Sequence, residues 1–207
     1  MIVAGVDVGG SKKGFHAVAL KGGAYFDQFA WPDAAAIADW CRGIDAYVIG
    51  VDAPCRWSLT GRACPAEREL MALKICCFST PSREAAKSHP QDHFRWMLNG
   101  AELFAQLEST HSLFVGTSPC MKRRVCFETF PQAIACALAG TIVSARKKRT
   151  IRRELLERAG VDTSKLTNID TLDAALCALM AHYFSLGSFK TYGEGPTGLI
   201  VVPGMGR

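Results

Sequence analysis

The sequence predicts an α/β fold: a mixed five-stranded sheet flanked by helices, with a mostly helical insertion. Three observations support it. Short runs rich in Val and Ile open the chain and are separated by glycines, as in strands joined by hairpins. Later apolar runs of strand length alternate with stretches of helical periodicity, as in parallel strands joined by crossover helices. One long internal stretch contains only loops and helical periodicity.

The first thirty residues predict three strands. Residues 2–8 form an apolar run typical of a buried strand. Residues 14–20 and 24–30 also have the composition of strands, and Gly22 with Gly23 between them is a hairpin signal. We therefore expect the chain to open with hairpin-connected strands.

A helix and a buried strand follow. Pro32 and Asp33 mark a helix start, because apolar residues at helical spacing come after them as far as Cys41. Residues 46–51 are continuously apolar, as central strands are, and this run ends at Asp52. We expect it to lie parallel to the first strand and beside it.

The stretch from residue 55 to residue 124 has a different character. It contains loops and two helical runs, near residues 66–76 and 91–108. We expect residues 1–207 to form one domain, in which residues 55–124 are a mostly helical insertion packed over one end of the sheet.

Strands and helices alternate again in the last third of the chain. Residues 125–130 have the composition of a strand, and the helix after it begins with a proline at its first position. Further helices are expected over residues 150–159 and 170–186, and a short strand over residues 198–202. The chain is thus expected to form antiparallel strands first and parallel strands joined by crossover helices later. The ribonuclease H-like fold has this order of elements.

Carboxylates stand at the ends of these elements. Asp7 and Asp52 end two strands expected to be neighbours, so their side chains would meet at one edge of the sheet. Asp170 and Asp173 lie one turn apart at the start of the last long helix, and Glu128 lies on the fifth strand. Close carboxylates repel unless a cation compensates them, and oxygen ligands suit Mg²⁺ or Mn²⁺. The set predicts catalytic acids around two ions, with the four aspartates as ligands.

Positive charge is clustered along the chain. The net charge is +5, and the isoelectric point is about 8.8. Such clusters favour a polyanionic partner such as nucleic acid. Lys122, Arg123 and Arg124 form one cluster. The residues expected to contact nucleic acid are Lys12, Lys13, Arg146, Lys147, Lys148, Arg149, Arg152 and Arg153.

The expected location is the cytoplasm. No apolar run reaches the roughly 18–20 residues that span a bilayer, so we expect no membrane partner. The chain begins directly with a strand and lacks a signal-peptide pattern. Its nine cysteines would be mostly reduced in that compartment.

Over roughly residues 2–203 the chain resembles domain-of-unknown-function family 429. The likeness consists of short blocks in the same order and spacing: GVDVGGSKKGFHAVAL, IGVDAPC, GRACPAEREL, FETFPQAIACALAG, NIDTLDAALCALMAHYF and GEGPTGLIVVP. That family is described as predicted nucleases with a ribonuclease H-like fold, so the resemblance implies this fold and a nuclease activity.

The resemblance also implies roles for individual acids. Asp7 matches the first-strand aspartate with which ribonuclease H-like enzymes bridge metals, and Asp52 matches the acid that ends the fourth strand. Asp170 or Asp173 matches the acid on the last helix, in a D-x-x-D arrangement like that of Holliday-junction resolvases of the RuvC type. The Glu that ribonuclease H carries on its first helix has no counterpart in this chain.

Two other acids, Glu67 and Glu128, match acidic positions of the family. The sequence leaves open which of the two faces the expected metal centre. No Ser-His or Cys-His nucleophile pair is suggested. The interpretation is a metal-dependent nuclease in which two ions activate water and stabilise the leaving oxygen of a phosphodiester.

Two alternatives remain open at the level of sequence. The segment Asp7-Val8-Gly9-Gly10-Ser11-Lys12 also resembles the first phosphate loop of sugar kinases in the actin-like superfamily. Those kinases use two such domains and usually well over ~250 residues to enclose the nucleotide, whereas this chain has one copy of the loop. The other alternative is a non-catalytic protein that binds nucleic acid or a protein partner.

Overall fold

The structure, a computed structural model, describes residues 1–116 and 123–204. Lys122 of the basic cluster predicted above lies outside them. The strands are β1 (Ile2–Val8), β2 (Phe15–Lys21), β3 (Ala24–Trp31), β4 (Ala46–Asp52), β5 (Ser112–Leu113), β6 (Val125–Thr129), β7 (Phe189–Glu194) and β8 (Gly198–Pro203). The helices are α1 (Ala34–Gly43), α2 (Pro65–Ala72), α3 (Arg83–Ser88), α4 (Arg95–Leu107), α5 (Pro131–Ala139), α6 (Lys148–Arg158) and α7 (Ile169–Ser185), with short 3-10 turns η1 (Ala145–Lys147) and η2 (Gly195–Thr197).

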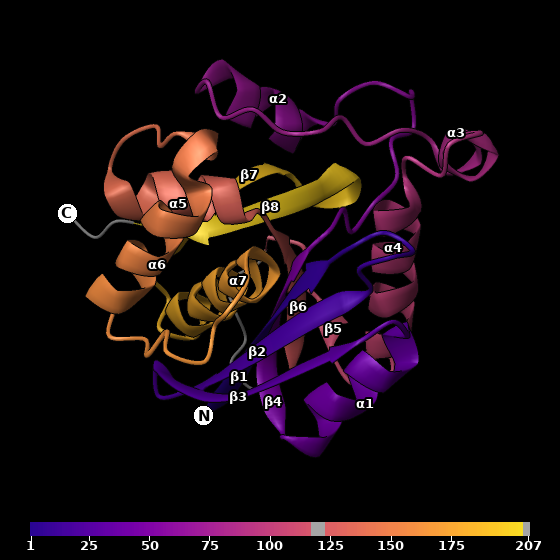
Figure 1. Ribbon diagram of the computed structural model, residues 1–207. Helices are drawn as coiled ribbons and strands as arrows, with labels where there is room; N and C mark the ends of the chain where they lie inside the picture. The colour runs from indigo at the N-terminus through magenta and orange to yellow at the C-terminus, as the bar shows by residue number, and fades with distance from the viewer. Residues whose placement is uncertain (117–122, 205–207) are drawn as a thin grey trace.

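All strands belong to one mixed sheet in the order β3-β2-β1-β4-β6-β8-β7, and β5 pairs with β6 (Figure 1). β2 is antiparallel to β1 and β3, whereas β1, β4, β6 and β8 are parallel to one another. The predicted mixed sheet and its central parallel pair, β1 with β4, are therefore confirmed.

The sheet has eight strands within the described residues, against the predicted five-stranded sheet and short strand over residues 198–202, so β5 and β7 were not expected. β5 has only two residues, too few for a pattern to be visible in the sequence. β7 is the outer strand of an antiparallel pair with β8, and its side chains are mostly exposed or half-buried. It therefore lacks the continuous apolar run that marked the other late strands.

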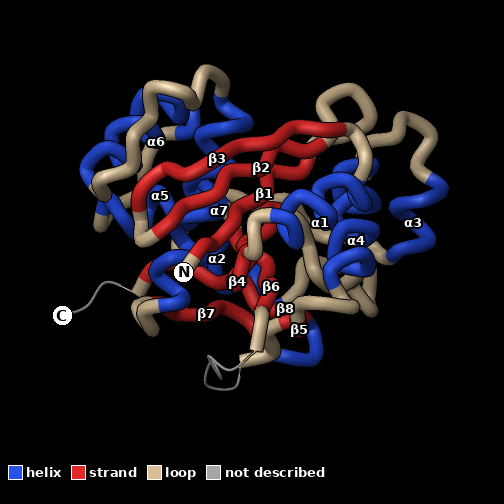
Figure 2. The backbone as a smooth tube through the Cα atoms, turned by 90° about the horizontal axis from the view of Figure 1, so that it is seen from below, coloured by secondary structure: helices blue, strands red, loops and turns tan. Residues whose placement is uncertain are grey.

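Helices cover both faces of the sheet (Figures 1 and 2). α7 lies against β1 and β4 on one face, with α5 and α6 beside it, and twelve of its residues are buried. The other face is covered by α1 and α4, whose buried side chains include Ile37, Leu103 and Leu107. No described helix is long and apolar enough to cross a bilayer.

The segment 55–124, expected to be a helical insertion, contributes to several parts of the molecule. α4 packs against α1 and joins the layer on that face. α2 packs against β7 and β8 at the far edge of the sheet, and β5 extends the sheet beside β6. The described part of this segment thus brings side chains from α2 and α4 to the end of the sheet where Asp52 stands.

The close approach of α7 to the sheet requires glycine on the facing strands. A Cβ at Gly5 would lie 2.0 Å from the backbone nitrogen of Ala178 and 2.2 Å from the carbonyl oxygen of Ala174. A Cβ at Gly50 would lie 2.7 Å from the carbonyl oxygen of Cys177. Backbone atoms of a packed helix cannot yield as a flexible side chain can, so only glycine fits at these positions.

We predict that Gly5→Ala lowers the free energy of unfolding by about 3 kcal/mol or more, because it forces α7 away from β1. Urea denaturation followed by circular dichroism measures the effect. Gly43→Ala is the matched control, since a Cβ there meets no atom within 4 Å. A Gly5→Ala protein as stable as this control would contradict the packing described here.

Candidate active site

The centre of the site is a pair of carboxyl groups at the ends of β1 and β4. Asp7 and Asp52 are in register on these parallel strands, and alternation along each strand turns both toward α7. Each carboxyl group lies close enough to the other to shift its pKa, and Asp7 is only 9% exposed. The adjacency predicted from the sequence for these two residues is present in the structure.

Burial makes two adjacent negative charges unfavourable at this place. Burial and then the nearby Asp170 raise the pKa of Asp7 to about 7. Burial and then Asp7 raise the pKa of Asp52 well above its ordinary value. The pair therefore requires a shared proton or a cation at neutral pH.

The start of α7 contributes two more carboxylates, and each already has a cationic partner. Asn168 caps the helix by accepting a hydrogen bond from the backbone N–H of Thr171. Asp170 in the first turn accepts a 2.8 Å hydrogen bond from Nζ of Lys13. Asp173, one turn later and buried, forms an ion pair with Arg152 of α6.

The position of Arg152 corrects a prediction. This residue was expected on a surface that contacts nucleic acid, but it is 5% exposed and paired with Asp173. Arg153 is half-buried, and its guanidinium donates to Thr163 and to the carbonyl oxygen of Leu166 in the loop after α6. Arg152 lies on the side of α6 that packs on the core, where arginine needs an internal partner.

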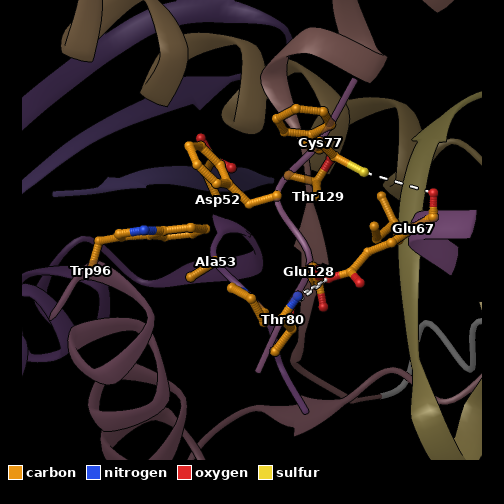
Figure 3. A pocket seen from close by; sticks show the side chains of 12 residues that line it. Asp52, Ala53, Glu67, Cys77, Thr80, Trp96, Glu128 and Thr129 are labelled. Carbon is orange, nitrogen blue, oxygen red and sulfur yellow. Dashed lines mark hydrogen bonds between the residues drawn. The ribbon is translucent and has the colours of Figure 1, made fainter. Parts of the chain in front are cut away.

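Glu128 and Glu67 line one open pocket together with Asp52 (Figure 3). Glu128 accepts a 2.8 Å hydrogen bond from the backbone N–H of Cys55, and burial raises its pKa to about 8. Glu67 is at position N3 of α2, where one oxygen accepts from the backbone N–H of Cys64 and the other from Thr80. Glu67 thus stabilises the start of α2, and Glu128 is the acid that adjoins Asp52.

The donor set at this site fits one divalent cation. Asp7 and Asp52 offer neighbouring oxygen ligands, and their pKa values are raised chiefly by burial, then by Asp170 for Asp7 and by Asp7 for Asp52. The larger set predicted from the sequence is not assembled, because Asp170 and Asp173 are paired with Lys13 and Arg152. Across residues 1–116 and 123–204, no three His, Cys, Asp or Glu side chains are grouped so that they could hold a metal ion.

The strand order, the antiparallel β2 and the acidic pair that ends β1 and β4 define a ribonuclease H-like α/β protein. The chain belongs to the family described as "Protein of unknown function (DUF429)", whose model matches residues 5–197. This membership confirms the resemblance recognised in the sequence.

Two solved structures are similar in fold, although distantly. The structure of Thermus thermophilus RuvC is 15% identical to this chain, with a TM-score of 0.45. The alignment covers 91% of this chain and 98% of the RuvC chain. T. thermophilus RuvC in complex with a Holliday junction substrate is 14% identical to this chain, with a TM-score of 0.48. That alignment covers 90% of this chain and 96% of the RuvC chain. At these values neither likeness supports a functional assignment. No curated protein matches the chain.

Sequence reasoning missed two features of the site. Arg152 was placed on the surface, although its spacing from the buried Leu155 and Leu156 is that of one helical face. Trp96 and Phe78, which line the pocket beside Asp52, gave no signal at all. They come from segments that are distant in sequence from every acid of the site.

We predict that Arg152→Ala lowers the free energy of unfolding by about 3–5 kcal/mol, because Asp173 is left buried without its cation. Denaturant unfolding at neutral pH measures the loss. Arg149→Ala is the control, since Arg149 is exposed and donates one hydrogen bond to the carbonyl oxygen of Thr167.

The double variant Arg152→Met with Asp173→Leu should recover much of the loss, because an apolar pair of similar volume removes both buried charges. An Arg152→Ala protein within about 1 kcal/mol of the wild type would show that this ion pair does not stabilise the fold.

Proposed function

We propose that the protein is a metal-dependent nuclease, in which Asp7 and Asp52 hold a divalent cation of the Mg²⁺ or Mn²⁺ type. The observation that supports this proposal is the pair of neighbouring carboxyl groups, of the buried Asp7 and the half-buried Asp52, at the carboxyl ends of two central parallel strands. Such a pair costs stability unless a cation or a proton compensates it.

The bound cation would supply Lewis-acid activation of water and charge stabilisation at the phosphodiester. The chain's own residues orient this chemistry. Arg152 fixes Asp173 and adds positive charge beside Asp7 and Asp52. Lys13 fixes Asp170 at the open side of the pair. A second ion, as anticipated from the sequence, would require Asp170 or Asp173 to leave its present partner.

The exposed basic segment supports nucleic acid as the substrate. Arg146, Lys147, Lys148 and Arg149 are exposed at η1 and the start of α6. The hydrogen bond from Arg149 to the carbonyl oxygen of Thr167 holds this segment near the start of α7, which carries Asp170. Phosphates bound along this segment would therefore lead toward the acidic pair.

Hydrogen bonding in the turn after β1 weighs against the phosphotransferase alternative. The backbone N–H of Gly9 donates to the carbonyl oxygen of Gly14. The backbone N–H groups of Lys13 and Gly14 both donate to the carbonyl oxygen of Gly10. The ammonium of Lys13 pairs with Asp170. Several donors that could hold a nucleotide phosphate, namely these three N–H groups and the ammonium of Lys13, are thus used inside the protein. The remaining alternative to a nuclease is a protein that binds nucleic acid without cutting it. The following experiment distinguishes the two.

We predict that the purified protein nicks single-stranded, duplex or branched nucleic acid in Mg²⁺ or Mn²⁺ and stops in EDTA. Asp7→Asn should lower the cleavage rate by roughly 100-fold or more, because it removes a metal ligand. Mn²⁺ should raise the melting temperature of the wild type and not that of Asp7→Asn.

Asp39→Asn is the control, because Asp39 is exposed and pairs with Arg42 on the surface. Cleavage by Asp7→Asn at the wild-type rate would point to a contaminating nuclease. A wild type that binds nucleic acid and cuts none of these substrates would establish the non-catalytic alternative instead.

We also predict that replacing Lys147 and Lys148 with Ala reduces the slope of log K against log salt by about 2, since each phosphate contact contributes about 0.9. Fluorescence anisotropy with labelled DNA at several salt concentrations measures the slope. Replacement of Lys21 and Lys190 is the matched control, because Lys21 lies at the end of β2 opposite to Asp7 and Lys190 lies on the edge strand β7, three strands away from β4. An equal slope in the two double variants would exclude a role for the basic segment.

A further inference from the structure

A group of exposed arginines lies in the segment that follows β4. Its members are Arg56, Arg62, Arg68 and Arg83. The guanidinium of Arg68 donates to the carbonyl oxygen of Ala63. The other three guanidinium groups form no ion pair or hydrogen bond within residues 1–116 and 123–204. Their donors are therefore available to a ligand.

Two of these arginines share a pocket on the α4 side of the sheet. Arg56 and Arg83 line it together with Trp57. Leu113 and Cys126 line it from β5 and β6, and both belong to the core that α1 and α4 cover. The pocket has room for about 480 Å³, which is within the range usual for small-ligand sites.

The other two arginines line a second pocket, of about 210 Å³, at the start of α2. The half-buried Trp57 lines both pockets, so all four arginines surround one short stretch of loop. Among the described residues, the one acid that lines the first pocket is Glu108, and no Asp or Glu lines the second. The four arginines thus form a positively charged surface, called here the arginine surface.

The acidic pair lies between the arginine surface and the basic segment. Arg56 follows Asp52 by four residues, so their Cα atoms are at most about 14 Å apart. The basic segment is at the start of α6, on the side of the sheet that α7 covers, whereas the pocket of Arg56 and Arg83 is on the α4 side (Figures 1 and 2). Asp7 and Asp52 end two strands of the sheet that separates these sides.

A nucleic acid that crosses this end of the sheet would meet positive charge on both sides of the acidic pair. Guanidinium groups suit its phosphates, because the planar fork donates two parallel hydrogen bonds to phosphate oxygens. The arginine surface consists of this group alone, without lysine among the residues that line its two pockets. Phosphate groups are therefore the ligand that its chemistry fits best.

We propose that the arginine surface binds backbone phosphates of nucleic acid, on the side of the acidic pair opposite to the basic segment. This inference rests on the proposed function for the identity of the ligand, but it does not require cleavage. It implies that one nucleic-acid molecule contacts both surfaces at once, and that the backbone between these contacts passes Asp7 and Asp52.

The test measures binding of labelled duplex DNA by fluorescence anisotropy in EDTA, where no metal-dependent cleavage occurs. We expect Arg56→Ala with Arg83→Ala to lower the affinity roughly tenfold or more and to reduce the slope of log K against log salt by about 2, since each phosphate contact contributes about 0.9. Arg56→Lys with Arg83→Lys keeps both charges and should keep the slope.

The matched control is Arg42→Ala with Arg158→Ala, which removes the same charge elsewhere. Arg42 lies in the last turn of α1, and Arg158 lies at the end of α6 opposite to the basic segment. This control should bind as the wild type does. A quadruple variant that also carries Lys147→Ala and Lys148→Ala should lose about 4 in slope, because both surfaces hold the same DNA.

A wild-type slope in the Arg56→Ala, Arg83→Ala protein, or a wild type that does not bind DNA, would overturn the arginine surface. A quadruple variant with no smaller slope than either double variant would overturn its placement across the acidic pair from the basic segment. In neither case does the outcome depend on cleavage. A wild type that shows the expected slopes but cuts nothing would instead refute the nuclease and keep the arginine surface.

Discussion

The contact between the backbone of α7 and the strands β1 and β4 is the constraint on which the rest of the structure depends. Gly5 and Gly50 lack side chains, so the helix lies directly on the two central strands. This approach places the first turns of α7 over the ends of β1 and β4, where Asp7 and Asp52 stand. A wider spacing would move Asp170 and Asp173 of α7 away from Asp7 and Asp52 of the strands.

Charge compensation then determines what the acidic site can do. The fold provides an internal cation for each of the two aspartates on α7, Lys13 for Asp170 and Arg152 for Asp173. Asp7 and Asp52 keep raised pKa values chiefly because burial opposes their charges, although Arg152 acts against the shift of both and Lys13 against that of Asp7. The site therefore divides into helix acids that are paired within the protein and strand acids whose charge is compensated only in part.

The surroundings of the acidic pair differ in chemistry. Exposed Lys and Arg residues of η1 and α6 lie near the start of α7, and positive charge of this kind suits phosphates. The pocket beside Asp52 is lined by acidic and aromatic side chains instead, and the segment between β4 and β6 contributes most of its residues.

The sequence by itself determined the sheet, its central parallel pair and the places of Asp7 and Asp52. Periodicity and apolar runs are local properties, and strand ends follow from them. It did not determine β7, because an exposed edge strand has no apolar run. Only the tertiary structure decided that Arg152 turns inward to Asp173, and that Trp96 and Phe78 lie beside Asp52. These contacts join residues far apart in the chain, and their partners depend on how α4, α6 and α7 pack on the sheet.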